Sequence, residues 1–150
     1  MSPDPYKDLS IKHPPNPCYS KIPVIGTVNT LLHAKNDRRA LEISPYPSRA
    51  FQKYEVHELI ITPEMDAGPN AVVNNVIYFC FFEMDNSGVL WVGDTVEVDG
   101  VEIGTLAGYD FTHLPNHMNI IVKSDHFLKT GKEAGSSLGS KIKFTFNPTT

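Results

Sequence analysis

The chain has 150 residues, of which 41% are hydrophobic and 20% are charged, and it carries a formal net charge of −4. This length and composition are typical of one soluble globular domain with a single core. No apolar run approaches the roughly 20 residues that a membrane-spanning helix requires. We therefore expect a single domain without a membrane partner.

Charged residues are distributed unevenly along the chain. Residues 1–53 carry eight Lys or Arg against four Asp or Glu, whereas residues 54–122 carry eleven Asp or Glu and no Lys or Arg. Because such an acidic body repels phosphate backbones, we expect no nucleic-acid partner. The basic first third is suited to an acidic partner, and we favour docking on the protein's own acidic body or on a neighbouring subunit of a homo-oligomer.

The two cysteines lie in different contexts. Cys80 is inside an apolar run and is typical of a buried free thiol, while Cys18 lies in a polar, proline-containing stretch. The first residues lack the basic segment and apolar core of a secretory signal. These features favour a reducing, cytoplasmic setting.

The first 23 residues differ from the rest in composition. They contain six of the twelve prolines, which predicts an extended, polyproline-like arm over residues 1–23. We expect residues 24–150 to form the folded domain.

Short apolar segments separated by turn residues predict strands through the remainder of the chain, and no window has a long helical period. The Asp99-Gly100 pair is a strong signal for a two-residue hairpin. We expect an antiparallel all-β fold, either a sandwich or a small barrel. The expected strands are residues 24–33, 54–62, 72–83, 89–92, 95–98, 101–109, 116–123 and 141–146.

Residues 72–83 are apolar on both of the faces that a strand presents, so we expect both faces to be covered. Asn74 and Asn75 point to opposite faces of this strand, which predicts that at least one of them is buried and hydrogen-bonded. A buried amide and a nearby phenol suit a ligand pocket, so Asn74, Asn75 and Tyr78 are candidate substrate-binding residues.

The densest polar chemistry lies in residues 110–119, between two apolar segments. Asp110, His113 and His117 are candidate catalytic residues, because a histidine transfers protons near neutral pH and a carboxylate can orient it. Asn119 would share the strand face of His117 and is a candidate substrate-binding residue.

Two other interpretations compete for these residues. Asp110 and its polar neighbours could simply hydrogen-bond the backbone of their own loop. A metal site is the second alternative, with His113, His117 and either Asp110 or His57 as ligands. Pro115 disfavours the helix that would align the two loop histidines, so we expect no metal and no organic cofactor. His57 is instead a candidate substrate-binding residue, provided that it meets the loop in space.

These observations favour a small-molecule enzyme without an organic cofactor, of the isomerase, lyase or cyclase type. Its His and Asp side chains would act as acid–base groups in a β-barrel pocket. The alternative is a non-catalytic ligand-binding or oligomeric assembly module. Convergence of His57, His113, His117 and one of the two asparagines on a single cavity would favour the enzyme.

Overall fold

The computed structural model describes residues 21–147, and these form an all-β fold, as the sequence predicts. No helix in this part of the chain has the length and apolarity needed to cross a membrane. The strands of residues 21–147 are β1 (Val24–Leu31), β2 (Lys35–Asn36), β3 (Leu41–Glu42), β4 (Ser48–Phe51), β5 (Val56–Thr62), β6 (Val72–Val73), β7 (Val76–Met84), β8 (Gly88–Trp91), β9 (Thr95–Val98), β10 (Val101–Asp110), β11 (Asn119–Lys123) and β12 (Lys141–Thr145).

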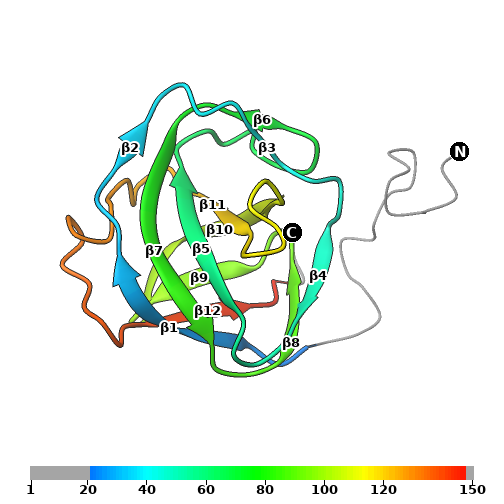
Figure 1. Ribbon diagram of the computed structural model, residues 1–150, viewed down its shortest axis with the longest axis vertical. Coiled ribbons are helices and arrows are strands. Elements are labelled where there is room, and N and C mark those ends of the chain that lie inside the picture. Colours follow the sequence, from blue (N-terminus) through cyan, green and yellow to red (C-terminus); the bar gives the residue numbers. More distant parts are fainter. Residues whose placement is uncertain (1–20, 148–150) are drawn as a thin grey trace, which may run out of the picture.

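The main sheet closes on itself as a barrel-like ring (Figure 1). Its strands follow the order β1-β12-β9-β10-β11-β5-β7, and β7 also pairs with β1. Each neighbouring pair in the ring is antiparallel except β5 and β11, which are parallel. Ring closure decides between the two expected all-β architectures in favour of the barrel-like one.

Apolar side chains from all seven ring strands fill the interior. On β5, Leu59 and Ile61 belong to this inner core, and Tyr109 of β10 is fully buried there. Successive side chains of a strand point to opposite faces, so the residues between these face outwards. The interior is therefore a packed apolar core.

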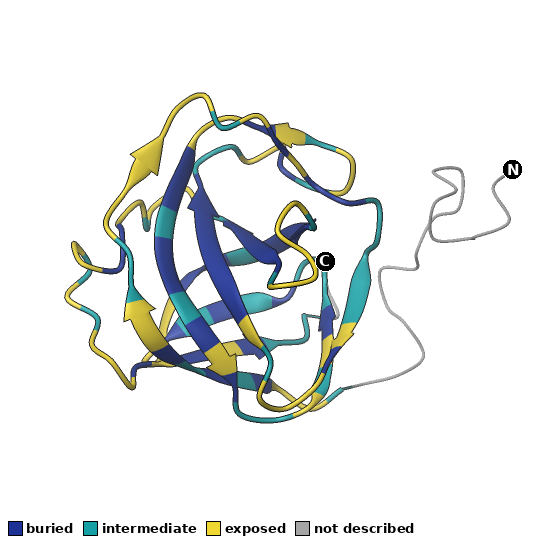
Figure 2. Cartoon of the chain, in the orientation of Figure 1, coloured by how far each residue is buried: buried dark blue, intermediate teal, exposed yellow. Residues whose placement is uncertain are grey.

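A second apolar cluster covers part of the outer face of the ring, where β5 is buried along most of its length (Figure 2). Ile60 of β5 and Ile121 of β11 point outwards and meet Leu41 of β3 and Val73 of β6. The β3–β6 pair lies over this face as a small two-stranded sheet. Both sides of β5 are consequently buried, and the outer cluster ends beside the polar residues 110–119.

Each segment predicted to be a strand contains one, with shifts at the ends. Residues 72–83 instead form two strands, β6 and β7, because the chain leaves the extended pairing at Asn74 and Asn75. The short strands β2, β3 and β4 lie outside the segments predicted to be strands. Their two to four residues are too few to show a periodic pattern.

Most of the predicted arm, together with Cys18, lies outside the described residues. Where the description begins, Lys21 Nζ lies 2.9 Å from Asp94 Oδ2, and both side chains are largely buried. Burial raises the pKa of Asp94, while the hydrogen bond and charge of Lys21 oppose this rise. The ion pair attaches the start of the described chain to the turn between β8 and β9.

Candidate functional site

The polar loop starts at the end of β10 and finishes at the start of β11. Asp110 and Asn119 are register partners on these strands, and Asn119 Nδ2 donates to Asp110 Oδ2 over 2.8 Å. Thr112 donates to Asp110 Oδ1 from its hydroxyl at 2.6 Å and from its backbone N–H at 3.3 Å. Asp110 is thus bound by its own loop and by β11, and these bonds, not a histidine, orient its carboxylate.

Glu58 of β5 joins this polar group on the outer face of the sheet. It is the register partner of Asn119 in the parallel β5–β11 pair, and only 7% of its surface is exposed. Burial raises the pKa of Glu58, the charge of Arg39 opposes this rise, and the charge of Asp110 adds to it. The Arg39 guanidinium lies 3.9 Å from Asp110 Oδ2, so one cation serves two neighbouring carboxyl groups.

His117 faces Glu58 with one ring nitrogen. Its Nε2 lies 3.5 Å from Glu58 Oε1, while its Nδ1 lies 2.9 Å from the Asn116 side-chain nitrogen. Because an amide nitrogen is a donor, Nδ1 is the acceptor and the proton of the neutral ring is on Nε2. Burial lowers the pKa of His117, and the charge of His113 lowers it further.

Two rings enclose the His117 imidazole. His113 stacks on it with 4.9 Å between centroids and an interplanar angle of 21°, and the Phe81 ring meets it edge-on at 5.1 Å. His113 itself is exposed. The two loop histidines therefore stack on one another, with His117 partly buried and His113 exposed to solvent.

Two buried polar atoms of this group lack a hydrogen bond to any of residues 21–147: His117 Nε2 and Asn119 Oδ1. Buried polar atoms in folded proteins are nearly always paired with protein or water. His117 Nε2 lies 3.5 Å from Glu58 Oε1, and Asn119 is the register partner of Glu58. A small movement, a water or a ligand would form new hydrogen bonds at this place.

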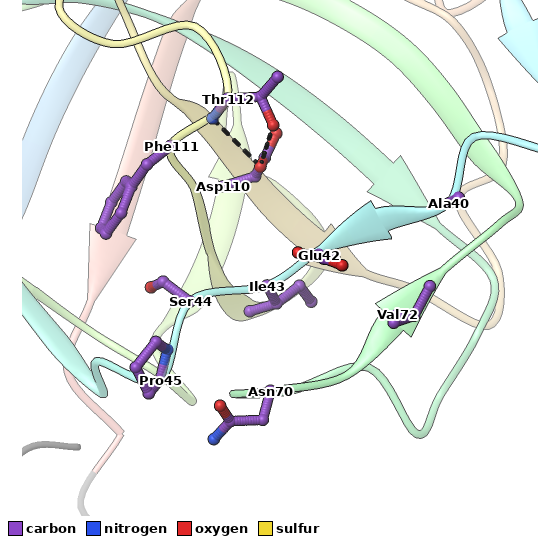
Figure 3. A pocket seen from close by; sticks show the side chains of 10 residues that line it. All are labelled: Ala40, Glu42, Ile43, Ser44, Pro45, Asn70, Val72, Asp110, Phe111 and Thr112. Carbon is purple, nitrogen blue, oxygen red and sulfur yellow. Dashed lines mark hydrogen bonds between the residues drawn. The ribbon is translucent and has the colours of Figure 1, made fainter.

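An open pocket of about 630 Å³ adjoins this group at Asp110 (Figure 3). Its volume is in the range of small-molecule sites. Ser44 lines the pocket and is buried, and its hydroxyl is another atom without a hydrogen bond to the described residues. The lining residues are Ala40, Glu42, Ile43, Ser44, Pro45, Asn70, Val72, Asp110, Phe111 and Thr112.

His57 lies on the opposite face of β5 from Glu58 and points into the packed interior. It is 4% exposed, and both ring nitrogens have partners: Met118 N–H at Nδ1 and Glu55 Oε1 at Nε2. A ring with both nitrogens occupied inside the core does not line the pocket. His57 therefore does meet the loop, but through a hydrogen bond to the Met118 backbone. It is buried and is not among the residues that line the pocket.

The expectation that Asn74 or Asn75 is buried is wrong, because both are exposed between β6 and β7. Their backbone N–H groups donate to Glu64 Oε2 at 2.9 and 2.6 Å, which ends the strand in solvent. Asn74 nevertheless supports the site indirectly. Its side-chain oxygen accepts from Ala40 N–H, and its backbone oxygen accepts from Arg39 N–H.

Tyr78 packs against the outer apolar cluster and lines none of the pockets described for residues 21–147. It is therefore not brought to the pocket beside Asp110. The same part of the chain contains no group of three or more His, Cys, Asp or Glu side chains arranged to hold a metal ion.

Glu58 and Arg39 are the members of the site that sequence reasoning missed. Glu58 lies in an apolar strand, and only its spacing of one residue from His57 marks it as facing the other way. Its proximity to His117 depends on the parallel pairing of β5 with β11, which joins strands that are distant in sequence. Arg39 lies in the polar stretch Asn36-Asp-Arg-Arg39, which has no periodic pattern that would indicate where its side chain points.

Residues 18–145 match the model of a family described as a family of unknown function, DUF6917, and the chain belongs to that family. No curated protein and no solved structure matches the chain. The chemistry of the site therefore has to be inferred from its own residues.

Proposed function

We propose that this member of the DUF6917 family is a cofactor-independent enzyme that moves a proton on a small molecule, as isomerases, lyases and cyclases do. The observation that supports this most is the pairing of a neutral, partly buried imidazole with a buried carboxyl group. His117 Nε2 lies 3.5 Å from Glu58 Oε1 and has no hydrogen bond to the described residues. Groups with environments of this kind concentrate at functional sites.

His117 would act as the general base through Nδ1, the nitrogen on the solvent side. The exposed Asn116 amide occupies that position and is the group that a substrate would displace. When Nδ1 accepts a proton, the ring becomes a cation whose Nε2–H faces Glu58. A carboxylate at this place stabilises the imidazolium and keeps the ring in the useful tautomer.

The pocket beside Asp110 would hold the substrate. Asp110 lines it and is joined through Asn119 to the strand pair that carries Glu58. Phe111 and Pro45 supply apolar surface, and the Ser44 hydroxyl, which has no hydrogen bond to residues 21–147, can bond a polar group of the ligand. Apolar walls with a few polar groups are typical of small-molecule sites.

Proton abstraction can be tested without knowing the complete reaction. Small ketones, aldehydes, hydroxy ketones and lactones are incubated with the protein in D₂O, and loss of the proton beside the carbonyl is followed by NMR. We expect exchange of at least one compound, and a decrease of about 100-fold or more in His117→Ala, the size of a general-base contribution. The thermal midpoint of His117→Ala should change little, since the side chain is near the surface.

His126→Ala is the matched control. His126 is exposed, lies beyond β11, bonds Asp125 at 2.8 Å and the Glu102 carbonyl at 3.2 Å, and is not a member of the polar group. It should retain the exchange rate of the unmodified protein. The proposal is refuted if exchange is absent for the whole panel, or if His117→Ala and His126→Ala exchange at the same rate.

Binding without turnover is the second candidate, because neither Glu58 nor His117 is among the residues that line the pocket. A compound that raises the thermal midpoint of the unmodified protein and of His117→Ala equally, without proton exchange, would favour this function over the enzyme.

A further inference from the structure

Two consecutive residues of β5 bind the backbone of Met118, the residue that directly follows His117. His57 Nδ1 accepts the Met118 N–H over 3.1 Å, and Glu58 N–H donates to the Met118 carbonyl over 3.1 Å. Met118 itself is fully buried in the inner core. His117 is therefore followed directly by a residue whose N–H and carbonyl are both hydrogen-bonded to β5.

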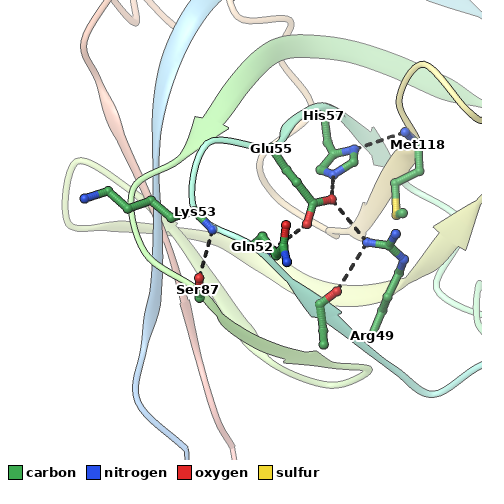
Figure 4. Close-up of polar contacts among 8 residues, drawn as sticks. Arg49, Gln52, Lys53, Glu55, His57, Ser87 and Met118 are labelled. Carbon is green, nitrogen blue, oxygen red and sulfur yellow. Dashed lines mark hydrogen bonds and ion pairs between the residues drawn. The ribbon is translucent and has the colours of Figure 1, made fainter.

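The Met118 contact determines the tautomer of His57. A backbone N–H can only donate, so Nδ1 must be unprotonated and the ring proton must be on Nε2. Nε2 lies 2.9 Å from Glu55 Oε1, which accepts that proton (Figure 4). Glu55 also accepts from Gln52 N–H and lies 3.5 Å from Arg49 Nη1.

A second proton on His57 is incompatible with this arrangement. It would add an N–H at Nδ1 that faces the Met118 N–H, so the hydrogen bond would be replaced by two opposed donors. Burial lowers the pKa of His57, Glu55 opposes this through a hydrogen bond and its charge, and the charges of Arg49 and His117 lower the pKa. The Phe51 ring packs edge-on against the imidazole at 5.2 Å.

We propose that His57 is a positioning residue: its neutral imidazole holds the Met118 peptide so that His117 faces Glu58, and its protonation releases this part of the loop. An effect of His57 on catalysis rests on the function proposed above. Its hydrogen bond to Met118 does not depend on that function. The site would then lose its geometry in acid through a residue that never touches the ligand.

Comparing His57→Leu with His57→Asn distinguishes the contribution of the hydrogen-bond acceptor at Nδ1 from that of the rest of the ring. Leucine fills much of the space but cannot accept a hydrogen bond, whereas the asparagine oxygen reaches the place of Nδ1. In His57→Leu we expect hydrogen exchange of the Met118 amide to accelerate about tenfold or more, consistent with loss of one buried hydrogen bond. The pKa of His117, followed by NMR, should rise as the ring becomes more exposed.

His57→Asn should restore both properties toward those of the unmodified protein. It should also keep the Met118 amide protected in mild acid, where the unmodified protein loses that protection as His57 titrates. Leu59→Ala is the matched control, because Leu59 lies two residues further on the same inward face of β5. It should destabilise the fold without a selective change at Met118 or His117.

Unchanged Met118 exchange and an unchanged His117 pKa in folded His57→Leu would overturn the proposal. If His57→Leu does not fold, His57→Asn decides alone: loss of Met118 protection in acid like that of the unmodified protein would also overturn it. Absence of proton exchange with an intact effect of His57 on Met118 and His117 would instead refute only the proposed function.

Discussion

Asp110 and Asn119, the first and last residues of the polar segment, are register partners, and a buried hydrogen bond of 2.8 Å joins their side chains. The bond closes the base of the loop that carries both histidines. It also places Asn119 between Asp110 on β10 and Glu58 on β5, because Asn119 pairs with Glu58 on its other side. The loop is thus attached to the sheet by the residues that form the candidate site.

Asn119→Leu is expected to destabilise the protein by about 1–3 kcal/mol, the cost of leaving a buried carboxylate oxygen without a donor. Urea denaturation measures this difference. Asn116→Ala is the control, since Asn116 is exposed and its side chain bonds, among residues 21–147, its neighbour His117 alone. Its effect should stay within about 0.5 kcal/mol. Equal losses in the two variants would show that the Asp110–Asn119 bond contributes nothing specific.

Glu58→Gln is expected to raise the free energy of unfolding at neutral pH. Burial raises the pKa of Glu58 above its ordinary value of 4.5, so the folded state binds the proton more tightly than the unfolded state. Ionisation therefore lowers stability as the pH rises from 4.5 through the folded-state pKa. The neutral amide of glutamine does not have this cost.

The gain from Glu58→Gln should therefore be smallest in acid and should increase as the pH rises, reaching a plateau above the folded-state pKa. Urea denaturation across this range measures it. Glu102→Gln, at an exposed position of β10, should show no such pH-dependent gain. A pH-independent difference between Glu58→Gln and the unmodified protein would contradict the assignment of the raised pKa to Glu58.

His113→Ala is expected to raise the pKa of His117. The His113 charge lowers the pKa of His117, and the stacked His113 ring shields it from solvent on one side. Removing that ring removes both influences. NMR titration of the His117 ring protons measures the change, and His126→Ala should leave it unaltered. A decrease in the pKa of His117 would contradict the stacked arrangement.

Gly131→Ala should destabilise the protein by about 1–3 kcal/mol, the usual cost of overpacking. A Cβ atom at Gly131 would lie 2.1 Å from the Phe79 carbonyl oxygen of β7, a backbone atom that cannot move aside alone. The neighbouring Lys132 N–H donates to the Leu32 carbonyl, so the loop is attached to the ring here. Gly68→Ala is the control, since its Cβ would meet nothing within 4 Å. Thermal unfolding distinguishes the two, and equal midpoints would contradict the close approach.

Local patterns were sufficient to predict the seven strands of the ring, but not the short strands β2, β3 and β4. Alternating apolar residues predict most of the ring, and the hairpin at Asp99-Gly100 is confirmed, with φ of 49° and 83° at its two residues. The polar segment is confirmed between β10 and β11. Patterns of this kind can be read from sequence because side-chain direction alternates within each strand, independently of what the strand pairs with.

Long-range pairing decided the rest. Closure of the ring joins β1 to β7, and the site depends on the parallel pairing of β5 with β11. These pairings join residues 49 to 61 positions apart in the sequence, and local periodicity contains no information about them.

The sequence by itself therefore determined an all-β chain with a polar loop carrying His113 and His117. Only the tertiary structure decided that the carboxyl group facing His117 is Glu58, and that His57 points into the core to hold Met118. The physical reason is that alternation along β5 separates residues 57 and 58 to opposite faces, but which groups meet them there depends on the neighbouring strand.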